Sequence, residues 1–174
     1  NTYPEITEMQ TKAIIGAAIQ LRREGHDPHP EIMVPLVGRH HEFDQQEAVI
    51  RKTAAELFKA EGVEPFEFKV GTMIEVPRAA LTADAVAVRA EYFSFGTNDL
   101  TQMTFGYSRD DIASFLPVYL EKKILKVDPF QVLDQNGVGQ LIKMAVNAAR
   151  SVKPDFHCGI CGEHGGDPET IKFC

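Results

Sequence analysis

The feature that most constrains the fold of this chain is a regular alternation between two kinds of segment. Apolar residues at helical spacing predict helices over four segments: 4–24, 42–61, 81–90 and 138–152. Between them lie four short apolar runs that are typical of buried strands: 32–37, 66–76, 92–98 and 156–161. The nearly continuous apolar run 32–37 is of the kind found in strands that are buried on both faces. Because helices that alternate with such strands form parallel sheets with right-handed crossovers, the sequence predicts an α/β fold.

The length of the chain leaves two architectures open, a small open sheet or part of a closed (β/α)8 TIM barrel. A closed barrel needs eight strands and usually about 250 residues, whereas this chain has 174 residues. It opens directly in a helical pattern and closes on the apolar letters IKFC. We therefore expect a single domain over 1–174 that is part of a barrel, with about four parallel strands, incomplete at both ends. Pro35 predicts a bulge or an edge position in the first strand.

Charge and composition argue against several classes of function. The net charge is −7 and there is no long run of lysine or arginine, so neither nucleic acid nor an anionic membrane surface is expected as a partner. No apolar run approaches the ~20 residues that span a bilayer, and the first residues lack a secretory pattern. Three cysteines without such a pattern favour free thiols in a reducing compartment. We expect a cytoplasmic protein, or a plastid one in a plant.

Two acidic residues lie where neighbouring predicted strands end. Glu75 ends the second strand, and the third reaches Gly96 and then the polar residues Thr97, Asn98 and Asp99. Because the carboxyl ends of parallel strands meet at one rim, we expect the two carboxylates to lie side by side. Their hard oxygens suit Mg²⁺ or Mn²⁺, which complete their coordination with water and substrate oxygens.

Simpler interpretations of these residues stay open. Glu75 would be a solvated strand end paired with Arg78, and Asp99 would cap a helix that begins at Leu100. Arg109 either turns back to bind a carboxylate or phosphate, or is simply solvated. The surrounding segment 107–135 departs from the alternation, and we expect it to cover the site or a partner subunit.

Cys161 ends the fourth predicted strand at the same rim. A thiol beside a divalent cation there is suited to proton transfer, although a free cysteine is more often a small buried apolar residue. Cys158 and Cys161 also form a C-x-x-C pair, followed by His164, which is the pattern of a zinc or redox module. Against zinc, residues 158 and 161 of a strand point to opposite faces.

Nearly the whole chain is covered by a resemblance carried by three strings: KVGTMIEVPRAALTAD, YFSFGTNDLTQMTFGYSRDD and CGICGEHGGDP. They closely resemble the carboxyl-terminal phosphoenolpyruvate/pyruvate domain of the pyruvate, phosphate dikinase family. Phosphoenolpyruvate synthase and enzyme I of the sugar phosphotransferase system belong to the same wider family. The resemblance implies that this domain is a (β/α)8 barrel.

The resemblance also implies roles for individual residues. Glu75 and Asp99 would bind Mg²⁺, and Cys161 would be the general acid/base at the methyl carbon of pyruvate. The substrate pocket would be lined by a larger set: Glu75, Gly96, Thr97, Asn98, Asp99 and Arg109. Arg109 aligns with a phosphoenolpyruvate-binding arginine of the enzyme I branch, and two further arginines of the family have no counterpart here.

The family reaction converts ATP, pyruvate and phosphate to AMP, phosphoenolpyruvate and diphosphate through a phosphohistidine. The implied partners are pyruvate or phosphoenolpyruvate, the phosphohistidine and ATP-grasp domains of a longer enzyme, and a second copy in a homodimer. Neither of those domains is visible in the sequence, so no dikinase turnover is expected from this chain alone. Three alternatives are a phosphoenolpyruvate synthase or enzyme I-like domain, a non-catalytic oligomerisation piece, and the zinc or redox module.

Overall fold

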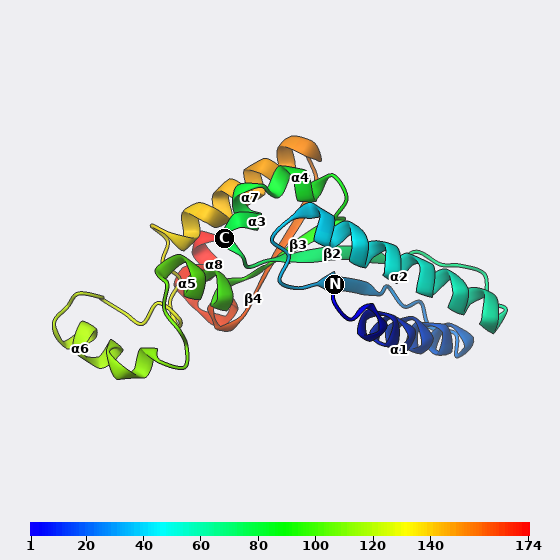
Figure 1. The fold of residues 1–174 in the computed structure, drawn as a ribbon, viewed down its shortest axis with the longest axis horizontal. Coiled ribbons are helices and arrows are strands. Elements are labelled where there is room, and N and C mark those ends of the chain that lie inside the picture. The colour runs from blue at the N-terminus through cyan, green and yellow to red at the C-terminus, as the bar shows by residue number, and fades with distance from the viewer.

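Four strands form one parallel sheet whose spatial order follows the chain. In the computed structural model, which describes residues 1–174, the strands lie in the order β1-β2-β3-β4 (Figure 1). Their bounds are Glu31–Val34 for β1, Lys69–Ile74 for β2, Tyr92–Gly96 for β3 and His157–Cys161 for β4. Helices connect each strand to the next parallel one. This is the topology of part of a (β/α)8 barrel, so the predicted fold class is confirmed.

The long helices agree with the predicted segments to within two residues at either end. The helices and short 3₁₀ turns are α1 (Pro4–Arg23), α2 (His40–Glu61), α3 (Pro77–Leu81), α4 (Ala83–Ala87), α5 (Thr97–Phe105), η1 (Ile112–Ser114), α6 (Leu116–Glu121), α7 (Val138–Val152), η2 (Glu163–Gly166) and α8 (Pro168–Phe173). Gly62 ends α2 in the left-handed conformation, at φ 62°. None of the helices combines the length and hydropathy that a membrane span requires.

The predicted helix over 81–90 is wrong in its bounds. Pro77 instead occupies the first position of α3, where a missing N–H costs nothing. Thr82 then leaves helical geometry, at φ −124° and ψ 32°, and separates α3 from α4. Two short helices therefore stand where one was predicted.

Each strand is shorter than its apolar run. β1 ends at Val34, directly before Pro35, which has no N–H to donate to a neighbouring strand. β1 also lies at the edge of the sheet, in keeping with the edge position predicted for Pro35. β3 ends at Gly96, so Thr97 already begins α5.

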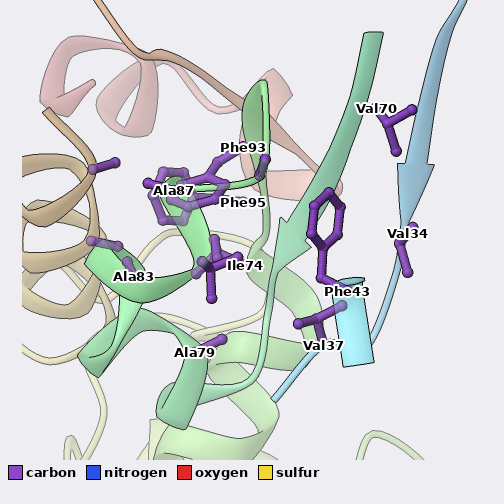
Figure 2. Packing of buried hydrophobic residues seen from close by; sticks show 14 of the residues in the cluster. Val34, Val37, Phe43, Val70, Ile74, Ala79, Ala83, Ala87, Phe93 and Phe95 are labelled. Atoms are coloured by element: carbon purple, nitrogen blue, oxygen red, sulfur yellow. The ribbon is translucent and has the colours of Figure 1, made fainter. Parts of the chain in front are cut away.

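The helices cover one face of the sheet, and a single apolar core lies between them. Its strand members alternate along the chain: Ile32, Val34, Val70, Ile74, Phe93 and Phe95. Figure 2 shows Phe93 and Phe95 beside Ala83 and Ala87, while Phe43 of α2 lies between the strands and Val37. Small alanines on α3 and α4 let these helices approach the large side chains of the sheet closely.

The opposite face carries the alternate residues of each strand, which contribute nothing to that core. These include Met33, Met73, Ser94, Gly96, Gly159 and Cys161. Met33 is 36% exposed, so β1 is buried on one face only, and the expectation that its run is buried on both faces was wrong. In a closed barrel this second face lines the interior. We call it the inner face.

Segment 107–135 leaves the regular pattern, as predicted. Figure 1 shows α6 at the end of a loop that extends away from the sheet. α6 has no buried residue. A row of aromatic rings connects the end of α5 to α6, with neighbouring centroids 5.0–5.1 Å apart: Phe105, Tyr107, Phe115 and Tyr119.

Candidate metal and substrate site

Glu75 follows β2 directly and is only 3% exposed. Its Oε1 accepts a hydrogen bond of 2.6 Å from the backbone N–H of Leu36, in the turn after β1. Leu36 adopts φ 55°, which is uncommon for a residue other than glycine. Arg78 donates instead to the carbonyl of Gly38, at 2.7 Å. The interpretation of Glu75 as a solvated partner of Arg78 is therefore wrong.

Asp99 lies in the first turn of α5 and approaches Glu75, as the strand ends predicted. Burial raises the pKa of Glu75, the N–H of Leu36 partly opposes this, and the Asp99 carboxylate raises the pKa further. Asp99 does not cap a helix at Leu100, because α5 already begins at Thr97. Its Oδ1 instead lies 3.2 Å from Nη2 of Arg109. Arg109 therefore does turn back towards the site.

Gly96 provides the space in which the Glu75 carboxylate lies. A Cβ at this position would be 2.5 Å from Oε2 of Glu75 and 2.5 Å from Sδ of Met73. The φ of Gly96 is −80°, so the requirement for glycine comes from this close approach and not from the backbone.

Cys161 lies next to Gly96 on the side of β4, opposite the side from which Glu75 approaches. It pairs in register with Gly96, and its Sγ lies 3.4 Å from the carbonyl oxygen of Phe95. The thiol is partly buried and belongs to the inner face. The Glu75 carboxylate and the Cys161 thiol thus flank the end of β3 from neighbouring strands.

Cys158 belongs to the opposite, helix-covered face. It pairs in register with Phe93, and burial raises the pKa of its thiol. Both ring nitrogens of His164 are engaged with other groups. Cys158 and Cys161 therefore do not converge on one ligand, and the structure contains no cluster of three or more His, Cys, Asp or Glu side chains suited to a metal.

Thr97 and Asn98, the two polar residues directly after β3, do not join the pair of carboxylates. The Thr97 hydroxyl donates to the carbonyl of Cys161 at 2.9 Å, and the residue is fully buried. Its side chain is therefore turned towards the carbonyl of Cys161 and not towards solvent. Asn98 keeps a buried Oδ1 that has no hydrogen-bond partner. This oxygen would lie 3.0 Å from a Cβ at Gly162, a glycine with φ 93°.

Sequence reasoning assigned no role to Glu163, which lies at the same rim. The pKa of Glu163 is lowered by its own backbone N–H, then by the Asn98 side chain and by Arg109. Its position two residues after β4 was a usable signal, because residues that follow parallel strands gather at one rim, the rule that predicted the other two carboxylates. The contribution of Leu36 had no such signal, since every residue except proline has a backbone N–H.

A divalent cation fits this donor set. Two carboxylates are close enough that Asp99 opposes the ionisation of Glu75, and a cation between them removes that repulsion. Because the protein offers two carboxylates here, water and substrate oxygens would supply the remaining ligands, as is usual for Mg²⁺.

The fold and the site define an α/β barrel-type domain with an acidic, thiol-bearing site at the carboxyl ends of its strands. The chain belongs to the family described as PEP-utilising enzyme, PEP-binding domain, which matches residues 1–174. It is 60% identical to pyruvate, phosphate dikinase 1, chloroplastic, of Arabidopsis thaliana, over 172 residues. The identity is 59% to the chloroplastic pyruvate, phosphate dikinase of Mesembryanthemum crystallinum and 56% to pyruvate, phosphate dikinase 2 of Zea mays.

These alignments cover 99% of this chain but only 18% or 19% of each relative. The chain therefore spans about a fifth of the length of the curated relatives it matches. The family resemblance carried by the three sequence strings is confirmed.

Proposed function

We propose that this chain forms the phosphoenolpyruvate/pyruvate site of a pyruvate, phosphate dikinase and carries out the enolisation half of its reaction. The observation that carries the proposal is that Glu75 directly after β2, Gly96 at the end of β3 and Cys161 at the end of β4 lie at one rim and on one face of the sheet. The similarity to three dikinases supports the same substrate class.

Glu75 and Asp99 are the residues that would hold Mg²⁺. When bound, Mg²⁺ supplies positive charge that stabilises an oxyanion and a transferring phosphoryl group. Glu75 is oriented for this role by the N–H of Leu36, which occupies Oε1 and leaves Oε2 over Gly96. Arg109, whose side chain is 48% exposed, would bind the carboxylate or phosphate of the substrate.

Cys161 would move the proton. Towards phosphoenolpyruvate, its thiolate takes a proton from the methyl carbon of pyruvate. The electron pair of the broken C–H bond forms the C=C bond, and the negative charge passes to the keto oxygen. This enolate oxygen then accepts the phosphoryl group of a phosphohistidine, whose P–N bond breaks and whose imidazole is the leaving group. In the reverse direction the thiol returns the proton to the same carbon.

The complete reaction would need a longer protein. ATP, pyruvate and phosphate would give AMP, phosphoenolpyruvate and diphosphate through a phosphohistidine domain and an ATP-grasp domain. Homodimerisation through this domain and a plastid or cytoplasmic location belong to the same proposal. Two of the relatives compared above are named chloroplastic.

Solvent exchange at the methyl group of pyruvate tests the proposal. In D₂O with Mg²⁺, proton NMR should show deuterium entering pyruvate, and Cys161→Ala should lower the rate by about 100-fold or more, the usual contribution of general acid–base catalysis. Cys158→Ala is the matched control, because that thiol lies on the opposite face. Exchange by Cys161→Ala at the wild-type rate would refute the role of Cys161.

A further inference from the structure

His164 is a fully buried titratable residue that the proposed chemistry does not use. It is 0% exposed and lies in η2, three residues after Cys161. Its Nδ1 is 2.7 Å from Oγ1 of Thr97, and its Nε2 is 2.8 Å from the carbonyl oxygen of Pro129. An imidazole with both nitrogens engaged is not available to a substrate or a metal. It can act on the site only through its neighbours.

Hydrogen bonds connect His164 to Cys161 through the side chain of Thr97. A carbonyl oxygen only accepts, so Nε2–H donates to Pro129. The Thr97 hydroxyl lies between Nδ1 of His164 and the carbonyl of Cys161, at 2.7 and 2.9 Å. The hydroxyl has a single proton, which it donates to the carbonyl of Cys161, so its Oγ1 bonds to the ring as the acceptor of an Nδ1–H. The ring therefore connects to the backbone of Cys161 through a single side chain.

His164 also anchors segment 107–135. Arg109, near the start of the segment, pairs with Asp99, and Pro129, near its end, accepts from His164. Between these two points the chain extends outward to α6 (Figure 1). The segment is thus attached at the site at both ends, once through a predicted metal ligand and once through the histidine.

We propose that His164 is a positioning residue that holds the Cys161 end of β4, the Thr97 start of α5 and segment 107–135 in one fixed arrangement. It thereby sets the position of the Cys161 thiol for proton transfer. The proton-transfer step rests on the proposed function, whereas the effect on the placement of Cys161 does not.

Two substitutions separate the two hydrogen bonds of the ring. His164→Asn keeps a polar atom at the position of Nδ1, facing Thr97, and loses the bond to Pro129. His164→Gln keeps a donor near the position of Nε2 and loses the bond to Thr97. We expect His164→Gln to lower kcat for methyl exchange by 10- to 100-fold, with KM for pyruvate changed less than about 3-fold. His164→Asn should keep kcat within about 5-fold of the wild type.

Alkylation of Cys161 is a second readout that needs no substrate. Iodoacetamide labelling followed by peptide mass spectrometry should show Cys161 of His164→Gln reacting at least 3-fold faster than in the wild type. Exposed Cys174 in the same sample is the internal reference. His157→Asn is the matched control, because His157 is exposed at the start of β4. It should leave exchange and alkylation unchanged.

Every outcome bears on the proposal. Equal losses of exchange in His164→Gln and His164→Asn, or no loss in either, would overturn it. If the wild type itself shows no exchange, the proposed function fails, and the alkylation rates alone decide the role of His164. If neither histidine variant folds, Thr97→Ser and Thr97→Val replace them. The hydroxyl kept by serine should then preserve the slow alkylation that valine loses, and equal rates in the two would contradict the proposal.

Discussion

At the scale of single residues, Gly96 gives the sharpest test of how the site is built. In Gly96→Ala the new Cβ would lie 2.5 Å from Oε2 of Glu75, so the carboxylate must move. We expect about 1–3 kcal/mol of destabilisation, as for other overpacked positions. Mg²⁺ affinity, measured by calorimetry, should fall at least about 10-fold.

Gly159→Ala is the matched control for this substitution. Gly159 lies on β4, on the same inner face, and a Cβ there would have its nearest neighbour at 4.0 Å. Mg²⁺ affinity in Gly159→Ala should equal that of the wild type. Equal losses of affinity in both variants would mean that any extra methyl group disturbs this face.

The pH dependence of stability gives a second residue-scale prediction. Below the ordinary glutamate pKa of 4.5, Glu75 is protonated in both the folded and the unfolded chain, and its contribution to stability is complete. As the pH rises through the raised pKa, the fold must ionise a buried carboxyl, and that contribution is lost. Glu75→Gln cannot ionise. In EDTA, its Tm should therefore rise relative to the wild type between pH 4 and pH 8, and a constant difference in Tm would contradict the raised pKa.

The sequence predicted those site residues that follow the end of a strand, because the ends of parallel strands meet at one rim. Glu75 and Asp99 each follow a strand, and parallel strand ends meet, so their proximity was predictable. The burial of Thr97 was not predictable, because it depends on where a histidine 67 residues later places its ring. The hydrogen bond from Leu36 to Glu75 was equally hidden, since it depends on the backbone conformation of an exposed leucine.

At the scale of elements, the start of α2 determines the turn that orients Glu75. The Glu42 carboxylate accepts from the N–H groups of Gly38 and Arg39, at 2.8 and 2.7 Å. Leu36 lies in the same turn. Glu42→Ala should cost about 1 kcal/mol of unfolding free energy, as the loss of a helix cap usually does. Because the turn is loosened, Mg²⁺ affinity should also fall.

Glu56 provides the control on the same helix. Its Oε1 lies 3.8 Å from Nζ of Lys52, and its side chain is 64% exposed. Such a surface pair contributes little, so Glu56→Ala should change the unfolding free energy by less than about 0.5 kcal/mol. Urea unfolding of both variants measures the difference. A Glu42→Ala variant as stable as Glu56→Ala would mean that the cap is not needed.

Sequence patterns predicted the bounds of the long helices better than those of the strands. The 3.6-residue periodicity placed α7 at its observed bounds, because one continuous apolar face determines them. The apolar runs overestimated the length of every strand, since an apolar residue beyond the last hydrogen bond between strands can still pack in the core. Val37 is such a residue, buried at 1% exposure but three positions beyond β1.

At the scale of the whole molecule, the charge of the chain makes anion binding depend on a cation. The chain has a net charge of −7, and three carboxylates lie at the rim beside Arg109: Glu75, Asp99 and Glu163. Arg109 is already paired with Asp99. A dianion that approaches this rim without a metal therefore meets a negative potential.

Oxalate, a dianion that mimics enolpyruvate, should bind this chain at least about 100-fold more weakly in EDTA than in millimolar Mg²⁺, since bound Mg²⁺ offsets the negative charge of the rim and offers the anion a cation to coordinate. Asp99→Asn should lose the Mg²⁺-dependent part of the affinity in calorimetry. Glu64→Gln changes the net charge equally, but lies in the loop before β2, at the far end of that strand from Glu75. If Glu64→Gln weakened oxalate binding as much as Asp99→Asn, the effect would come from net charge and not from a site. Tight oxalate binding in EDTA would show that protein cations alone hold the anion.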